Sequence, residues 1–256
     1  EIERAGLRRP RDFVRPETAG RAELLAAHDP GYLASLGSSR RIAEMLELPF
    51  LAKLPAWFLD RRVLLPMRRA TGGTILACRL ALSTGLAINL GGGFHHASGR
   101  FGGGFCVYAD VPTACAILRA EGALGRVLVV DVDAHQGNGT AAAFLDLEWA
   151  AMFDLYDRSI FPREKVRERY GFPLPAHADG PEYLDLICDE LPAALEDFRP
   201  DLVVLNAGSD PFVGDPLATL CLARDEIAER DRLVVELVRS RGIPLAMVLS
   251  GGYSRE

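Results

Sequence analysis

The feature that most constrains the fold is an alternation of short apolar runs with longer segments of helical periodicity. Five runs are rich in Val, Leu, Ile and Ala: 86–90, 126–132, 150–155, 201–206 and 244–250. Strands that are buried on both faces of a parallel sheet have near-continuous apolar sequences of this kind. The five runs therefore predict buried strands.

Four segments with helical spacing lie between or beside these runs: 74–83, 112–121, 181–195 and 222–241. Strands that alternate with helices run parallel and carry helices on both faces of their sheet. We therefore expect an α/β fold, a three-layer α/β/α sandwich with a central, mostly parallel sheet. Residues 17–69 should be mostly helical, with breaks at Asp29-Pro30 and at Pro49 or Pro55.

Length and composition favour one domain. The 256 residues, 49% of them hydrophobic, can bury a large core, and no internal repeat or low-complexity linker divides the chain. The sequence opens on Glu1 without a methionine and stops at Glu256, where an α/β domain would normally continue into another helix. We expect a single domain over residues 1–256 that is incomplete at both ends.

Charge and cysteine content limit the environment and the partners. The 29 Lys and Arg residues against 35 Asp and Glu give a formal charge of −6, without the basic excess that direct nucleic-acid binding requires. No stretch approaches the roughly 20 apolar residues of a membrane span. The five cysteines are scattered and form no Cys-x-x-Cys pair, which favours a reducing cytoplasm over a disulfide framework.

Polar residues and glycines gather where the predicted strands end. Four strands are followed by segments 91–96, 131–139, 206–211 and 250–253, which hold three of the five histidines in the chain. Ligands bind at the carboxyl ends of the strands in open parallel sheets. Glycines in these segments let the backbone bend sharply and approach a ligand closely. We expect the four segments to form one site.

The segment after the second predicted strand has the spacing of a metal site. Asp133 and His135 are two residues apart, so their side chains leave an extended strand end on the same side. Asp210 can supply a third ligand. One imidazole and two carboxylates suit zinc in a catalytic role, with positions open for water and a substrate carbonyl. Because two carboxylates cancel the charge of the ion, a separate general base is needed.

The adjacent histidines His95 and His96 can provide that base. One of them can remove a proton from water, while the other stabilises charge or helps to protonate a leaving amine. Tyr253 follows Gly251-Gly252 and can donate its phenolic hydrogen bond to a developing oxyanion.

Several neighbouring residues allow more than one interpretation. Asp131 can be a further metal ligand, a partner of a histidine, or a carboxylate that caps the sheet, and we favour the histidine partner. Asn138 can orient a catalytic histidine or simply form the turn. His28 and His177 are expected to serve turns, and Cys106 to be a buried thiol rather than a nucleophile.

Five segments occur in the order that is found in one known family: 91–97, 103–110, 131–139, 206–210 and 250–253. Together they resemble the arginase/deacetylase superfamily and, within it, the histone deacetylases, closest to the class IV (histone deacetylase 11-like) branch. The resemblance implies a deacetylase-type catalytic domain that removes acyl groups, acetyl or long-chain, from lysine N6 amides by metal-activated water. It implies that Asp133, His135 and Asp210 bind zinc, with iron as the alternative metal.

The same resemblance assigns the catalytic groups. His95 would pair with Asp131, His96 would act as general base and then acid, and Tyr253 would polarise the amide carbonyl. Many relatives have aspartate where this chain has Asn138, whereas class IV sequences have asparagine. Because an amide stabilises an imidazolium less than a carboxylate does, His96 should be less basic here.

The resemblance also implies a tunnel for the acyl-lysine side chain and a second cation. Gly104, Phe105, Phe161 and Leu217 match positions that line the tunnel or its rim. A potassium-type ion would bind near the zinc site, through backbone oxygens of Asp131, Asp133 and His135 together with Asp154 and Leu155, where Asp154 replaces a serine that is common elsewhere. The acidic rim residue that holds the substrate backbone in other classes has no clear match in residues 48–60.

Three other functions compete with that of a lysine deacylase. A ureohydrolase with two manganese ions needs further aspartates where this chain has Gly137 and Gly208. A deacylase of small-molecule amides such as acetylpolyamines shares the same catalytic residues. A non-catalytic acyl-lysine reader is disfavoured because every catalytic position is filled. The sequence does not indicate the oligomeric state, and the partner that we expect is an acylated lysine peptide or protein.

Overall fold

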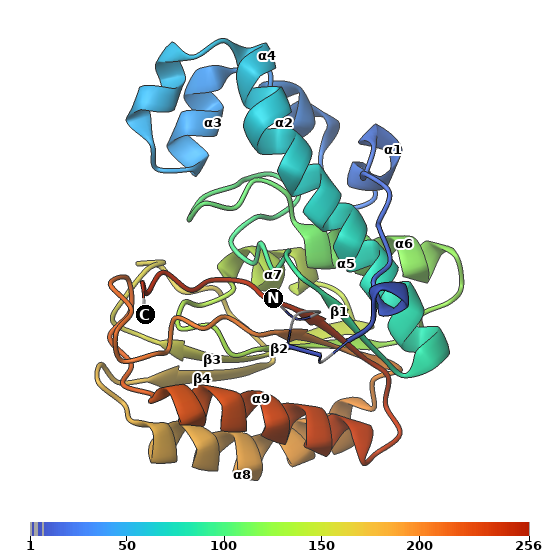
Figure 1. Ribbon diagram of the computed structural model, residues 1–256, viewed down its shortest axis with the longest axis vertical. Coiled ribbons are helices and arrows are strands. Elements are labelled where there is room, and N and C mark those ends of the chain that lie inside the picture. The colour runs from blue at the N-terminus through green and yellow to red at the C-terminus, as the bar shows by residue number, and fades with distance from the viewer. Residues whose placement is uncertain (1, 3–4, 7, 256) are drawn as a thin grey trace.

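The computed structural model describes residues 2, 5–6 and 8–255; Glu1 and Glu256, where we expect the sequence to continue, lie outside the described residues. A six-stranded sheet with the order β1-β6-β5-β2-β3-β4 lies between two layers of helices (Figure 1). All neighbouring strands pair in parallel. The strands are β1 (Leu86–Asn89), β2 (Val127–Asp131), β3 (Ala150–Asp157), β4 (Tyr170–Leu174), β5 (Leu202–Asn206) and β6 (Leu245–Val248). The predicted α/β sandwich is confirmed.

Helices cover both faces of the sheet. One face packs against α5 (Leu65–Thr84), α6 (Asp110–Ala120) and α7 (Asn138–Phe144), and the other against α8 (Gly180–Phe198) and α9 (Arg224–Arg239) (Figure 1). Shorter elements precede α5 in the chain: η1 (Pro10–Asp12), α1 (Arg21–Leu24), α2 (Pro30–Ser35), α3 (Ser39–Met45), η2 (Pro49–Lys53), α4 (Ala56–Leu59) and the π-helical turn η3 (Asp60–Leu64). The mostly helical character that was predicted for residues 17–69 is observed.

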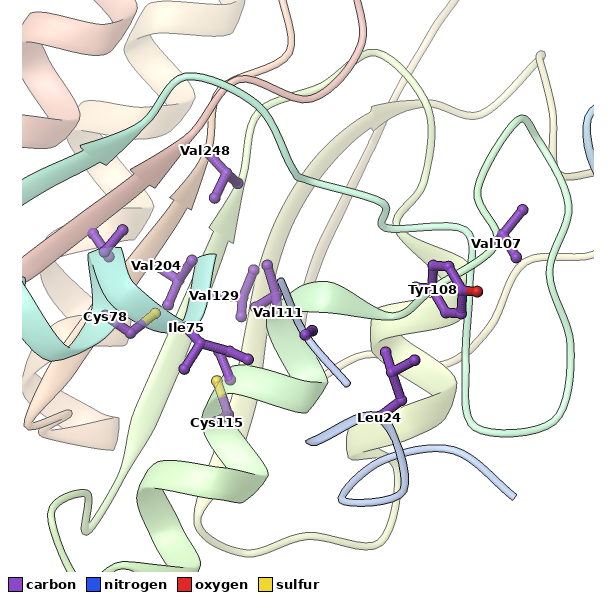
Figure 2. Packing of buried hydrophobic residues seen from close by; sticks show 14 of the residues in the cluster. Leu24, Ile75, Cys78, Val107, Tyr108, Val111, Cys115, Val129, Val204 and Val248 are labelled. Atoms are coloured by element: carbon purple, nitrogen blue, oxygen red, sulfur yellow. The ribbon is translucent and has the colours of Figure 1, made fainter. Parts of the chain in front are cut away.

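The central strands divide their side chains between two apolar cores. Val127 and Val129 of β2 face α5 and α6, whereas Leu128 and Val130 face α8 and α9. Figure 2 shows the first core, in which Val129 lies among side chains of the sheet and of the two helices. Successive side chains of a strand point to opposite faces, so a continuous apolar run fills both cores.

Two elements were missed by the sequence prediction. Strand β4 contains Gly171 and Pro173, which weaken its apolar pattern, but it pairs only with β3 at the edge of the sheet, where proline is tolerated. Helix α7 begins at Asn138, inside a segment that we interpreted as a loop because of its glycines.

His28 lies in the bend between α1 and α2, as expected, and its side chain has a further role that the sequence did not indicate. It is only 3% exposed, stacks on Tyr32 at 5.3 Å between ring centroids, and lies edge-on to Tyr108. Its Nε2 accepts a hydrogen bond from the Ala109 N–H at 3.0 Å. Burial lowers the pKa of His28 to about 4. The imidazole therefore joins the N-terminal helices to the start of α6 as a neutral side chain.

This burial predicts a specific sensitivity to acid. Because the pKa of His28 is lower in the folded chain than the ordinary 6.5, the unfolded chain binds more protons between about pH 6.5 and 4, and the folded state loses stability as pH falls through this window. Relative to His28→Gln, wild-type protein should lose up to about 3 kcal/mol of unfolding free energy across it. Urea unfolding of both proteins at several pH values measures this, and parallel stability curves would contradict it.

Candidate active site

Four neighbouring strands carry the predicted site segments. The loop after β1 holds His95 and His96, the end of β2 leads into Asp133 and His135, and the segments after β5 and β6 hold the remaining residues. Since β1, β6, β5 and β2 are adjacent and parallel, their carboxyl ends open at the same edge of the sheet. The structure thus brings the four segments together.

The Asp133, His135 and Asp210 side chains form a buried cluster. The His135 Nδ1 atom lies 2.9 Å from Asp210 Oδ2 and 3.2 Å from Asp133 Oδ1. One ligand atom from each of the three residues lies within 4.8 Å of the others. Backbone N–H groups hold the carboxylates in place: Ala134 donates to Asp210 Oδ1 at 2.8 Å, and His135 donates to Asp133 Oδ1 at 3.0 Å. These donors fit a single divalent metal ion.

The electrostatics of the cluster also favour a cation. Burial, reinforced by the charge of Asp133, raises the pKa of Asp210 to about 7. Burial alone would lower the pKa of His135, but its hydrogen bonds to Asp133 and Asp210 outweigh burial and raise the pKa to about 10. Two carboxylates repel each other strongly in a buried space, and a positive charge between them offsets that repulsion.

Two glycines leave room for the carboxylates. A Cβ atom at Gly208 would overlap Asp133 Oδ2, and one at Gly251 would lie 2.7 Å from Asp133 Oδ2 and 2.8 Å from Asp210 Oδ2. Side chains at these positions would therefore displace the metal-binding groups. Gly208 is also where a two-manganese ureohydrolase needs an aspartate, so the cluster has neither the ligand nor the space for such a site.

The two adjacent histidines have different partners. His95 Nδ1 lies 2.9 Å from Asp131 Oδ2, and His96 Nδ1 lies 2.7 Å from Asn138 Oδ1, while the two rings are 4.1 Å apart between centroids. Asp131 thus pairs with a histidine, as favoured from the sequence. Of the two roles left open for Asn138, the structure shows the contact with His96, and Asn138 begins α7 instead of forming a turn.

These partners separate the protonation states of the two rings. Burial opposes a charge on His95, but the charges of Asp131 and Asp133 outweigh it and raise its pKa to about 9. For His96, burial and the nearby His95 hold the pKa well below its ordinary value. At neutral pH, His95 is therefore cationic, whereas His96 is neutral and can accept a proton.

Tyr253 and the predicted tunnel residues lie at the exposed side of this arrangement. Phe161 lies edge-on to His96 at 4.9 Å between centroids, and Phe105 contacts Tyr253 at 5.8 Å. Gly104 has a positive φ of 50°, and a Cβ atom there would overlap the His96 ring. Leu217 is partly exposed on the segment that follows Asp210.

Two residues expected to have no catalytic role agree with that expectation. Cys106 is buried, its pKa is raised by burial, and its thiol contacts the Gly104 carbonyl. His177 is exposed in a turn, with a φ of 63°.

Asp154 and Leu155, which we expect beside a second cation, are adjacent in the buried strand β3. The Asp154 Oδ2 atom accepts a hydrogen bond from Gly137 N–H at 2.9 Å, and the same carboxyl lies beside the Glu168 side chain. Burial, then the charges of Glu168 and Asp131, raise the pKa of this carboxyl well above its ordinary value. A carboxyl that keeps its proton is a poor cation ligand, so the potassium-type ion stays a prediction that rests on backbone oxygens.

Three further residues support the site without having been assigned a role from the sequence. Asn206 lies opposite Asp131 in the sheet and donates to its Oδ1 atom at 2.8 Å, and Ser250 donates to Asp133 Oδ2 at 3.0 Å. Asp215 accepts hydrogen bonds from the backbone N–H groups of Tyr253 at 2.6 Å and Leu217 at 2.9 Å. A polar Asn206 at the end of a fully apolar strand was the signal that could have revealed the first of these.

A family model described as the histone deacetylase domain matches residues 1–256. The chain belongs to the histone deacetylase domain family. Its relatives include "Histone deacetylase 2" of Arabidopsis thaliana, which is 39% identical over 248 residues, covering 95% of this chain and 64% of the relative. A "Probable deacetylase" of Methanothermobacter thermautotrophicus is 29% identical over 262 residues, covering 95% of this chain and 75% of the relative.

A solved structure has the same fold as this family member. A histone deacetylase homologue in complex with the compound SAHA superposes with a TM-score of 0.78 at 24% identity, covering 98% of this chain and 71% of that one. The chain spans about two thirds of the length of the Arabidopsis relative, 64%. The comparisons thus show the family and the fold.

The glycine at 208 provides a test of the cluster geometry. Gly208→Ala should weaken binding of a divalent probe such as Co²⁺ by at least about tenfold, because the new methyl group displaces the Asp133 carboxylate. Gly103→Ala is the matched control, since a Cβ atom there has nothing within 4 Å. Titration followed by visible absorption measures both affinities. Equal affinities would show that Asp133 need not keep this position.

Proposed function

We propose that this chain is a zinc-dependent hydrolase that removes acyl groups from lysine N6 amides of proteins. One observation carries the proposal: the neutral ring of His96, held by Asn138, lies beside the buried donor set of Asp133, His135 and Asp210. A proton acceptor beside a metal site is what hydrolysis of an amide by water requires.

Asp133, His135 and Asp210 would hold the zinc ion, with iron as the alternative. When bound, the metal supplies Lewis-acid polarisation of the substrate carbonyl and makes the attacking water more acidic. Proton transfer and stabilisation of the developing charge fall to the protein's own side chains.

His96 carries the proton in this mechanism. Its neutral ring accepts a proton from the attacking water and then delivers it to the leaving lysine amine. Asn138 accepts from Nδ1–H and so keeps Nε2 free for this transfer. Because the partner is an amide, the imidazolium is stabilised less than it would be by a carboxylate.

His95 and Tyr253 stabilise the charge that develops on the substrate. The cationic His95–Asp131 pair places a fixed positive charge next to His96. Tyr253, whose backbone is held by Asp215, donates its phenolic hydrogen bond to the oxyanion. Phenols with a raised pKa keep their proton at neutral pH, and burial raises that of Tyr253.

The substrate is an acylated lysine side chain on a peptide or protein, with an acetyl or long-chain acyl group. Gly104, Phe105, Phe161 and Leu217 would line the tunnel for this side chain, as in the class IV branch that the sequence resembles. Residues 48–60 offer no free carboxylate to hold a peptide backbone, since their only acidic residue, Asp60, pairs with Arg68 at 2.7 Å. This favours small amides such as acetylpolyamines as the second candidate substrates.

Three further assignments accompany the proposed reaction. A structural potassium ion would bind near the zinc site through backbone oxygens of residues such as Asp154 and Leu155. The described cysteines are all free thiols, which supports a cytoplasmic location. No helix among the described residues is long and apolar enough to cross a membrane.

The first experiment is hydrolysis of matched acetyl-lysine and long-chain acyl-lysine peptides, with an acetylpolyamine alongside. Zinc-loaded protein should release acyl groups from at least one lysine peptide, and a chelator should abolish the reaction because it removes the metal that would polarise the substrate carbonyl. Asp210→Asn serves as a matched inactive variant. Cleavage of the polyamine alone would favour the small-amide substrate, and no cleavage of any substrate would favour a non-catalytic reader.

Tyr253 provides a test of oxyanion stabilisation. Tyr253→Phe removes only the phenolic donor and should lower kcat by about two orders of magnitude. Bound zinc should stay at the wild-type level, because the Tyr253 hydroxyl is not one of the proposed ligands. Steady-state kinetics and metal analysis of the same samples measure the two effects. Wild-type turnover in this variant would remove Tyr253 from the mechanism.

A further inference from the structure

Arg230, in the middle of α9, is the only lysine or arginine among the described residues that is classed as buried, with 0% exposure. Helix α9 lies beside α8 on the face of the sheet opposite to α5 (Figure 1). A buried guanidinium is costly unless its N–H groups are paired. The partners of Arg230 therefore indicate its role.

The guanidinium donates hydrogen bonds to a neighbouring side chain and to two backbone carbonyls. Nε and Nη2 both donate to Asp231 Oδ1, at 3.0 and 2.7 Å. Nη1 donates to two backbone carbonyls, those of Val132 at 2.9 Å and Gly208 at 2.6 Å. A single nitrogen atom thus links Val132 and Gly208, which are 76 residues apart in the sequence.

Both carbonyls belong to segments that carry the proposed metal ligands. Val132 lies directly before Asp133, and Gly208 lies two residues before Asp210. We propose that Arg230 is a positioning residue that fixes the spacing of these two segments, and thereby of the carboxylates that would bind the metal. The inference deepens the proposed function, on which its metal-binding part rests.

The peptide group between Val132 and Asp133 is held from three directions. Its carbonyl accepts from Arg230 and also from the buried Tyr183 hydroxyl of α8, at 2.9 Å. Its N–H donates to Asp131 Oδ1 at 3.2 Å. With its oxygen and nitrogen both bonded, this peptide has one orientation, which sets the direction in which the Asp133 side chain leaves the backbone.

The chemistry of arginine suits this position better than that of lysine. The planar guanidinium offers five N–H donors, enough to bond Asp231 and both carbonyls at once. An ammonium group can reach carbonyls as a compact charge but cannot reproduce this fork. A methionine has a similar length and would leave the Gly208 carbonyl without the donor that Arg230 supplies.

The test compares Arg230→Met and Arg230→Lys with Arg232→Met. Arg232 lies two residues further along the same helix and forms exposed ion pairs with Glu229 and Glu236, so its loss controls for a change in α9 itself. Hydrogen exchange of metal-free protein is measured for residues 132–135 and 207–210, with the strands β2 and β5 as internal references. Co²⁺ affinity is measured on the same proteins.

Arg230→Met should speed exchange in both segments by about tenfold or more, with the reference strands still protected, because the bridge between the segments is lost. Its Co²⁺ affinity should fall by about tenfold or more. Arg230→Lys should recover part of both losses, and Arg232→Met should match wild type. If Arg230→Met does not fold, the same two readouts on Arg230→Lys and Tyr183→Phe decide the question.

Unchanged exchange in both segments of a folded Arg230 variant would overturn the proposal, whatever the metal affinity. Failure of the proposed function is distinguishable from this result. If wild-type protein neither bound metal nor hydrolysed an acyl-lysine peptide, exchange in the metal-free proteins would still show whether Arg230 fixes the two segments.

Discussion

Three carboxylates, those of Asp131, Asp133 and Asp210, are buried near one another at the ends of β2 and β5, and their mutual repulsion is the strongest physical demand in this structure. Burial of like charges is tolerated only when opposite charge or hydrogen bonds compensate for it. The neighbouring groups supply this compensation, through imidazoles on one side and backbone N–H groups on the other. A metal ion would complete this compensation, so the repulsion among the carboxylates would itself favour the binding of a cation.

The two adjacent histidines have different protonation states because their surroundings differ. His95 and His96 have nearly the same burial, yet one faces a carboxylate and the other an amide. The charges of Asp131 and Asp133 outweigh burial and keep the His95 ring charged, whereas burial and the nearby His95 keep the His96 ring neutral. A charged His95 and a neutral, proton-accepting His96 can therefore lie side by side, because the groups that set their protonation states do not touch the substrate.

The sequence predicted the fold and the candidate site to different extents. Continuous apolar runs predicted five of the six strands, whereas Gly171 and Pro173 hid β4. The predicted burial holds for β2, β3 and β5, but the edge strand β1 has the exposed side chains Leu86 and Ile88. The site segments were recognisable because histidines, aspartates and glycines concentrate after strands. His28 and Arg230 were not recognisable in the same way. Their burial depends on how distant helices pack, and a single polar residue within a helical segment carries no local sign of that.

The residues that we propose for the chemistry and those that we propose for substrate selection differ in burial. The proposed ligands and both histidines are buried and are bonded to strand ends or to neighbouring loops, so their geometry follows from the sheet. Phe161 and Leu217, by contrast, are 44% and 42% exposed on connecting segments. Exposed connections tolerate change more readily than buried strand ends do. Differences in substrate between members of this family can therefore arise at the rim, while the buried carboxylates and histidines stay in place.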